Sequence, residues 1–226
     1  MPYTTLLFDI DHTLFDFDAS ESAAFAKTLA AFGVADPAAH VEQFTSINSS
    51  LWKAVERHEL SPNDVRTLRF ERLIGTASID ADPNEMANRY VSELGANGDL
   101  LPGARTLLDA LEGSYPMAIV SNGIGEVQRS KIGRLDIGRY FDAIVISGEV
   151  GTSKPGSEIF EIAFDRLGSP KKSATLMVGD SLTSDIEGGN RFGIDTCWVT
   201  TPDAPASDLP TYRIHDLDQV VALAGG

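Results

Sequence analysis

Two carboxylates that are two residues apart follow an apolar run near the start of the chain. Residues 4–8 have the composition of a buried strand, and Asp9 and Asp11 come directly after them. In an extended chain, residues i and i+2 point to the same side, so both carboxylates should face one pocket. Close carboxylates repel unless a cation lies between them or one of them takes a proton. The pair therefore predicts either acid–base chemistry or a site for a hard divalent cation such as Mg²⁺.

An acidic pair at a strand end can also be an ordinary solvated turn, so the prediction depends on partners elsewhere in the chain. Three more predicted strands are followed by polar residues that could bind a ligand or take part in catalysis. These are Ser121-Asn122-Gly123, then Ser147-Gly148-Glu149 with Lys154-Pro155 after it, and Gly179-Asp180-Ser181 with Asp185 one turn on. Ligands of open parallel sheets bind outside the carboxyl ends of the strands, so all four groups should meet at one site.

The elements that position these groups alternate between strand and helix from Leu101 onward. We expect strands at 116–120, 141–146, 174–178 and 194–199, and helices at 103–111, 125–135, 157–167 and 184–192. Such alternation indicates right-handed βαβ units and a parallel sheet. The run at 4–8 belongs to the same sheet, because its continuous apolar pattern requires burial on both faces.

Residues 15–100 have a different pattern, all helical with no strand signal. Ser20 is expected to cap a first helix that stops at Gly33, and Asp36-Pro37 and Ser61-Pro62 are expected to begin the second and third. A fourth helix is expected from Pro83 to Leu94. The helical block is therefore an insertion after the first strand, and the α/β domain is discontinuous, made of 1–14 and 101–226.

Composition narrows the class of protein and its partners. The chain has 226 residues and a net charge of −15, which disfavours nucleic acid polymers and anionic membranes as partners. No apolar run approaches a membrane span, and the N-terminus does not resemble a signal peptide. Cys197 is the only cysteine and lies in an apolar run, which favours a core position and a cytoplasmic location. An anionic substrate would need local positive charge, such as a metal with a nearby lysine.

The four strand-end groups, in this order, resemble the haloacid-dehalogenase-like hydrolase superfamily. The first motif, DxDx[TV], is matched by Asp9, Asp11 and Thr13; the next three are matched by Ser121, by Lys154-Pro155, and by Gly179-Asp180-Ser181 with Asp185. The resemblance implies a Rossmann-like three-layer core with a parallel sheet, and it makes 15–100 an inserted all-helical cap domain. The chain departs from the family pattern in one place, because Gly156-Ser157 stands where Asp-Pro is common. We expect Ser157 to cap the helix there.

The resemblance implies a role for each matched residue. Asp9 would be the nucleophile that forms an aspartyl phosphate, and Asp11 the general acid and then the base. Mg²⁺ would be held by Asp9, Asp180 and the main-chain carbonyl of Asp11, with Asp185 close by. Lys154 would compensate negative charge. The remaining predicted contacts to substrate in the core are Thr13, Ser121 and the amides of Asn122 and Gly123.

The residue types also separate reaction classes. The dehalogenases of the superfamily lack a carboxylate at the position of Asp11, so its presence here favours phosphoryl transfer. The cap and the first motif look similar to a bacterial branch of pyrimidine 5′-nucleotidases. In this interpretation Trp52 or Phe70 stacks on a base and Arg69 pairs with a base carbonyl. Alternatively, Trp52 and Phe70 are cap core, and Phe15 and Phe17 line the pocket mouth. His12 is given no catalytic role.

The sequence therefore predicts a Mg²⁺-dependent phosphomonoester hydrolase that acts on a small phosphorylated metabolite, a pyrimidine nucleoside 5′-monophosphate. One alternative is a phosphatase for another metabolite, such as a sugar phosphate or phosphoglycolate. A second alternative is a non-catalytic binding protein on the same fold, although such a protein would be expected to lose Asp9 or Asp11. We expect a monomer or a weak homodimer.

Overall fold

A single parallel sheet organises the larger part of the molecule. The computed structural model describes residues 3–77 and 79–225, and its sheet has the order β3-β2-β1-β4-β5-β6. The strands are β1 (Thr5–Phe8), β2 (Met117–Ser121), β3 (Ala143–Ile146), β4 (Thr175–Gly179), β5 (Asp195–Val199) and β6 (Tyr212–Ile214). β1 pairs with both β2 and β4, so the strand that precedes Asp9 lies in the middle of the sheet. The predicted α/β class with a parallel sheet is confirmed.

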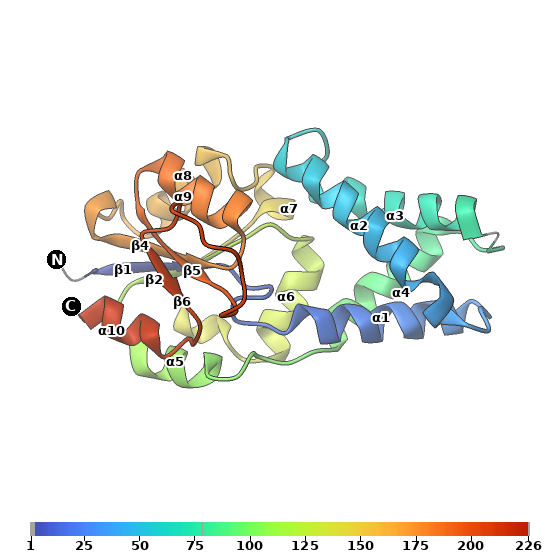
Figure 1. The fold of residues 1–226 in the computed structure, drawn as a ribbon, viewed down its shortest axis with the longest axis horizontal. Helices are drawn as coiled ribbons and strands as arrows, with labels where there is room; N and C mark the ends of the chain where they lie inside the picture. Colours follow the sequence, from blue (N-terminus) through green and yellow to red (C-terminus); the bar gives the residue numbers. More distant parts are fainter. Residues whose placement is uncertain (1–2, 78, 226) are drawn as a thin grey trace.

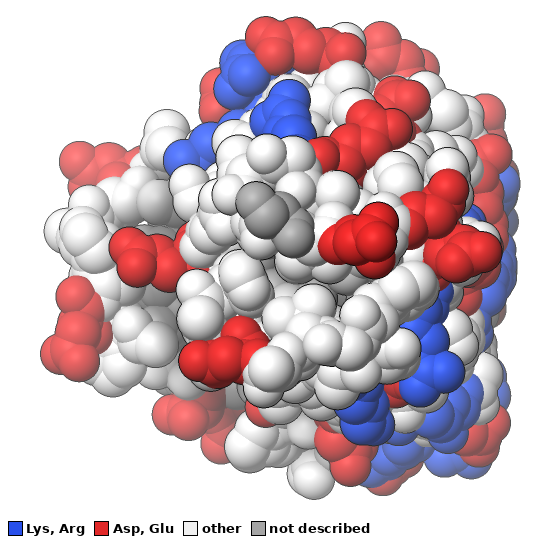
Figure 2. All heavy atoms as spheres, turned by 90° about the vertical axis from the view of Figure 1, so that its right-hand side faces the viewer, with Lys and Arg blue, Asp and Glu red and all other residues white. Residues whose placement is uncertain are grey.

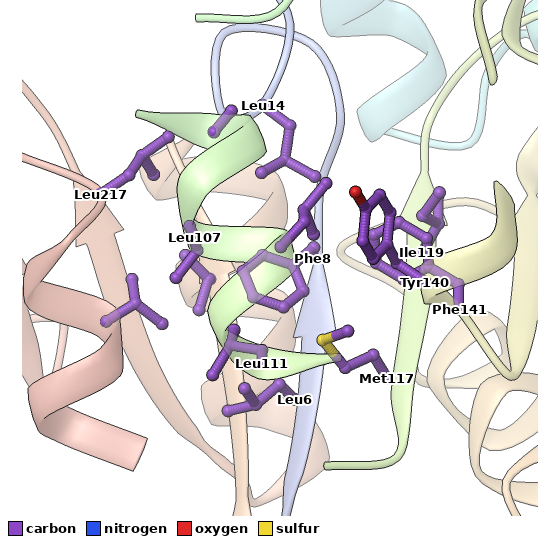
Figure 3. Close-up of a cluster of buried hydrophobic side chains, with 14 of the residues drawn as sticks. Leu6, Phe8, Leu14, Leu107, Leu111, Met117, Ile119, Tyr140, Phe141 and Leu217 are labelled. Carbon is purple, nitrogen blue, oxygen red and sulfur yellow. The ribbon is translucent and has the colours of Figure 1, made fainter. Parts of the chain in front are cut away.

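Helices cover both faces of the sheet, which gives three layers (Figure 1). One face packs against α5 (Ala104–Leu111), α6 (Gly125–Arg134) and α10 (Gln219–Gly225), and the other against α8 (Ser157–Arg166) and α9 (Glu187–Phe192). The period of two in β1 explains this division: Leu6 and Phe8 join the first cluster and Leu7 the second. Figure 3 shows Leu107 and Leu111 of α5 beside Leu6 and Phe8.

Four helices form the cap and extend away from the sheet (Figure 1). They are α1 (Phe17–Ala31), α2 (Val41–Glu56), α3 (Pro62–Ala77) and α4 (Pro83–Ala96). Aromatic side chains hold them together: the ring centroids of Phe25 and Phe44 are 4.3 Å apart, and those of Phe70 and Tyr90 are 5.3 Å apart. Val127 of α6 belongs to the same buried cluster, so α6 ties the cap to the sheet domain.

The chain leaves the sheet domain and returns to it along adjacent segments. Phe15 and Leu100 form an isolated antiparallel bridge, and the amide of Leu101 donates to the carbonyl of Leu14 at 2.9 Å. The predicted domain boundaries, 14/15 and 100/101, fall at this crossing. We therefore propose residues 15–100 as the cap domain.

Two predicted helix caps are wrong, and one predicted helix begins with a 3₁₀ turn. α1 begins at Phe17, capped by Asp16, which accepts from the amide of Ala19; Ser20 is buried and donates to the carbonyl of Leu94 at 3.1 Å. The helix predicted to begin at Asp36-Pro37 does begin there, as a 3₁₀ turn, Pro37–His40, that leads directly into α2 at Val41. Gly156 rather than Ser157 is the cap residue of α8. In the two wrong cases the cap residue lies before the serine that the sequence favoured.

The C-terminal β6 and α10 were not predicted, and neither was the short helix α7 (Ser147–Val150). β6 has three residues, too few for a clear alternating pattern. Cys197 is buried on β5, as predicted. Within residues 3–77 and 79–225, no helix has the length and apolar character needed to cross a membrane. Figure 2 shows the cap end, where acidic side chains are spread widely and basic ones gather toward the edges.

Candidate active site

The segment after β1 separates the two carboxylates that follow it. The amide of Asp9 continues the strand pairing by donating to the carbonyl of Val178 at 3.0 Å. The chain then turns sharply: the carbonyl of Ile10 accepts from three successive amides, residues 13–15, and His12 has a φ of 61°. Asp9 and Asp11 both line one cavity of about 250 Å³, yet their carboxylates contact different cations.

Lys154 is the cation next to Asp9. Its side chain is 1% exposed, and Nζ lies 2.7 Å from Asp9 Oδ1, 2.7 Å from Asp185 Oδ1 and 2.5 Å from the carbonyl oxygen of Val120. Burial alone would lower the pKa of Lys154, but the two carboxylates outweigh it and raise the pKa above its ordinary value. Lys154 is therefore a fixed positive charge inside the cavity.

Asn122 lines the cavity, and its side chain also fixes the backbone of Lys154. Its Nδ2 donates to the carbonyl of Lys154 at 2.7 Å, and its Oδ1 accepts from the amide of Lys154 at 2.8 Å. The amide of Gly123, predicted to bind substrate, instead donates to Ser147 Oγ at 3.0 Å. That prediction for Gly123 therefore needs correction, because its donor is already used to join the ends of β2 and β3.

Three carboxylates form a cluster suited to a divalent cation. Asp9, Asp180 and Asp185 each offer an oxygen, and these oxygens lie within 4.8 Å of one another. Asp185 is carried by a π-helical turn, Leu182–Ile186, and accepts from the amide of Ser181 at 3.0 Å. Gly179 makes room for it, since a Cβ there would lie 2.3 Å from Asp185 Oδ2.

The electrostatics of the cluster also fit a cation. Burial raises the pKa of Asp9 well above its ordinary value; Lys154 opposes the rise, and Asp185 adds to it. Burial and the charge of Asp185 together raise the pKa of Asp180 to about 7. One lysine thus does not compensate three carboxylates, and hard oxygen ligands of this kind suit Mg²⁺. This cluster consists of side-chain oxygens, and the main-chain carbonyl of Asp11 stays a predicted ligand of the metal.

Asp11 is held by two side chains of α6 that the sequence reasoning missed. Lys131 Nζ lies 2.7 Å from Asp11 Oδ1, and Gln128 Nε2 donates at 2.8 Å both to Asp11 Oδ2 and to Ser121 Oγ. Both α6 residues are about 1% exposed. Their spacing of three places them on one helix face, and a lysine buried there is a signal for a specific carboxylate partner.

Thr13 was predicted to bind substrate. In the structure it is fully buried, and its Oγ1 donates to Asp180 Oδ1 at 3.3 Å. Its contact is with the carboxylate cluster, so the predicted substrate contact is replaced by a role in orienting Asp180.

A second cavity, of about 200 Å³, lies between the cap and α6. It shares Asp11, His12, Trp52 and Asn122 with the first cavity, so the two adjoin. The remaining lining residues are Phe17, Arg69, Leu94, Gly123, Ile124, Val127, Gln128 and Lys131. The site thus has an acidic, lysine-containing part and an adjoining part with mostly apolar walls.

The predicted cap residues divide between this cavity and the protein interior. Trp52 borders both cavities and Arg69 borders the second. Phe70 is fully buried among the aromatic rings of the cap, so the suggestion that it stacks on a base is wrong. Phe17 lines the second cavity, as suggested, whereas Phe15 is buried in the sheet domain.

Comparisons with known proteins agree with this geometry. Residues 6–199 match the family model described as haloacid dehalogenase-like hydrolase. The chain is 36% identical to pyrimidine 5′-nucleotidase PynA of Streptococcus pneumoniae over 224 residues, covering 98% of this chain and 94% of PynA. It is 30% identical to pyrimidine 5′-nucleotidase YjjG of Escherichia coli, covering 98% and 99%.

Among solved structures, the magnesium-bound putative HAD-hydrolase YfnB of Bacillus subtilis superposes with a TM-score of 0.90 at 31% identity, over 100% of both chains. The fold, the ordered strand-end residues and these matches lead to one conclusion. The chain belongs to the haloacid dehalogenase-like hydrolase family.

Proposed function

We propose that the protein is a Mg²⁺-dependent phosphomonoester hydrolase that acts on pyrimidine nucleoside 5′-monophosphates through an aspartyl-phosphate intermediate. The observation that carries the proposal is the pair of adjoining cavities. One has a buried lysine, a serine and a carboxylate cluster suited to a phosphoryl group, and the other has apolar walls for the rest of the substrate. The relatives named pyrimidine 5′-nucleotidase support the substrate class.

In the first step a carboxylate oxygen of Asp9 attacks phosphorus, and the bond from phosphorus to the leaving oxygen breaks. Asp11 lines the same cavity and, once protonated in place of its ion pair with Lys131, gives that proton to the leaving oxygen. In the second step Asp11 takes a proton from water, whose oxygen attacks phosphorus and releases phosphate and the free Asp9 carboxylate.

The surrounding residues prepare these atoms for reaction. Lys154 contacts Asp9 and reduces the repulsion between its carboxylate and a phosphate. Ser121 Oγ, held by Gln128, is at the end of β2, where it would donate to a phosphoryl oxygen. Asp9, Asp180 and the carbonyl of Asp11 would hold Mg²⁺, with Asp185 beside them, and the ion would supply further charge neutralisation. YfnB, the similar solved structure, is described as bound to magnesium.

The proposal extends to the setting of the enzyme. The single cysteine is buried and has no second cysteine with which to form an internal disulfide, which suits a reducing compartment such as the cytoplasm. A monomer or weak homodimer is still the expected state.

A panel of phosphate esters tests the proposal. Purified protein is assayed for phosphate release from UMP, CMP, AMP, ribose 5-phosphate, phosphoglycolate and p-nitrophenyl phosphate, with Mg²⁺ and with EDTA. We expect metal-dependent turnover with the highest kcat/KM on pyrimidine nucleotides. Higher kcat/KM on the sugar phosphate or phosphoglycolate would replace the nucleotidase proposal, and no metal-dependent hydrolysis of any ester would favour a binding protein.

A further inference from the structure

One buried guanidinium in the second cavity has no part in the chemistry described above. Arg69 is 1% exposed, its Nε donates to the carbonyl of Val65 at 3.0 Å, and its guanidinium lies 5.1 Å from the ring centroid of Tyr90. Within the described parts of the chain, Arg69 Nη2 has no hydrogen-bond partner. Arg69 nevertheless borders the cavity of about 200 Å³. Arg69 therefore lines a space that adjoins the phosphoryl site, and its Nη2 is buried next to that space without a partner.

A buried charge with an unused donor is unfavourable for folding, so its presence needs a reason. Desolvation of an ion opposes burial, and an unsatisfied buried donor adds to that effect. Burial lowers the pKa of Arg69, and the nearby Tyr90 and Glu21 oppose the change. A ligand that accepts a hydrogen bond from Nη2 would complete the coordination of the guanidinium.

Three side chains from the other three cap helices form a hydrogen-bonded network, and one of them contacts Arg69. Glu21 of α1 accepts from Asn48 Nδ2 of α2 at 2.7 Å and from the Tyr90 hydroxyl of α4 at 3.2 Å, both at Oε1. Tyr90 in turn places its ring against the guanidinium of Arg69, which is on α3. The network fixes the guanidinium in one place, as a recognition group requires.

The walls of the cavity define what Arg69 can contact. Phe17, Trp52, Leu94, Ile124 and Val127 are apolar or aromatic. The other charged pair at the wall, Asp11 with Lys131, is joined at 2.7 Å. A flat ring that carries an acceptor atom fits such walls, because its faces meet apolar groups and its edge meets the Arg69 guanidinium.

We propose that Arg69 is a specificity-determining residue that donates from Nη2 to an acceptor atom on the base of the substrate, and that Glu21 is its positioning residue. This inference rests on the proposed nucleotidase function. It predicts that Arg69 acts on the base and leaves the phosphoryl chemistry unchanged.

The test compares Arg69→Met with Arg72→Met, an equal change at an exposed arginine on the same helix. UMP is the substrate with a base, and ribose 5-phosphate is its counterpart without one. In Arg69→Met we expect kcat/KM for UMP to fall roughly ten- to a hundredfold, mainly through KM, as for a lost charge-assisted hydrogen bond. For ribose 5-phosphate we expect a change of less than about twofold, and Arg72→Met should match the wild type on both.

Two milder variants keep the test decisive if Arg69→Met does not fold. Arg69→Lys keeps the charge and loses the forked donor set, and Glu21→Gln removes only the charge behind Arg69. Both should raise KM for UMP about three- to tenfold and leave ribose 5-phosphate unchanged. Equal losses on both substrates, or no loss on UMP, would overturn the inference. If the wild type does not prefer UMP over ribose 5-phosphate, the proposed function fails first, and the inference fails with it.

Discussion

Replacement of Lys154 by methionine tests whether the buried cation holds the acidic cluster together. The change keeps the aliphatic length of the side chain and removes the ammonium that contacts Asp9 and Asp185 at 2.7 Å each. Removing one partner of a buried ion pair costs about 3–5 kcal/mol, since the remaining charge is left uncompensated. For a chain of this size each kcal/mol lowers Tm by about 2–4 °C, so we expect a fall of roughly 6–20 °C.

The assay is thermal unfolding in EDTA, so that no added cation replaces the lysine. The control is Lys27→Met, because the side chain of Lys27 is about half exposed and lies 3.6 Å from Glu93. Its loss should change the free energy of unfolding by less than about 1 kcal/mol. The difference in Tm between the wild type and Lys154→Met should become smaller as the pH falls, because protonation removes the uncompensated charge of the carboxylates. A Tm within about 2 °C of the wild type would refute the claim that this ion pair supports the site.

Two further predictions concern the metal cluster and the cap. The pKa of Asp180 is raised to about 7 from 3.8, so the folded metal-free protein binds its proton more tightly than the unfolded chain does, and this contribution to stability is lost as the pH rises toward 7. Tm measured in EDTA should show that loss, Mg²⁺ should reduce it by competing with the proton, and Asp180→Asn should reduce it in part, because the raised pKa of Asp9 contributes to the same slope. An identical slope in all three samples would contradict the prediction. Trp52→Ala should lower the ratio of kcat/KM for UMP to that for ribose 5-phosphate by about three- to tenfold, since Trp52 borders both cavities. Loss of Tm with an unchanged ratio would instead make the ring a structural part of the cap.

The parallel sheet was predictable because local pattern and global fold agree there. The runs around Leu7, Ile119 and Val178 are apolar on both sides, as central strands of a covered parallel sheet require. The strand order then brings the polar residues after β1, β2 and β4 to one edge. The insertion of a helical block was equally visible, since its period of 3.6 residues interrupts the alternation of strands and helices.

The partners of each site residue were less predictable, because they depend on side-chain packing across elements. The spacing of Asp9 and Asp11 indicated one shared pocket, but the turn at His12 gives the two carboxylates different cations, Lys154 and Lys131. Nothing local to residue 11 indicates that α6 will supply its partners. Likewise, the aromatic side chain of Phe70 could stack on a base, and only the packing of the cap shows that it is buried.

Identification of the covalent intermediate tests the central claim most directly. The protein is mixed with Mg²⁺ and excess substrate, quenched in acid during turnover and reduced with borohydride, which converts an aspartyl phosphate into homoserine. Peptide mass spectrometry then locates the modified residue. We predict homoserine at position 9, absent when substrate is omitted and absent in Asp9→Asn. Turnover without homoserine at position 9, or with homoserine at another aspartate, would contradict the assignment of Asp9 as the nucleophile.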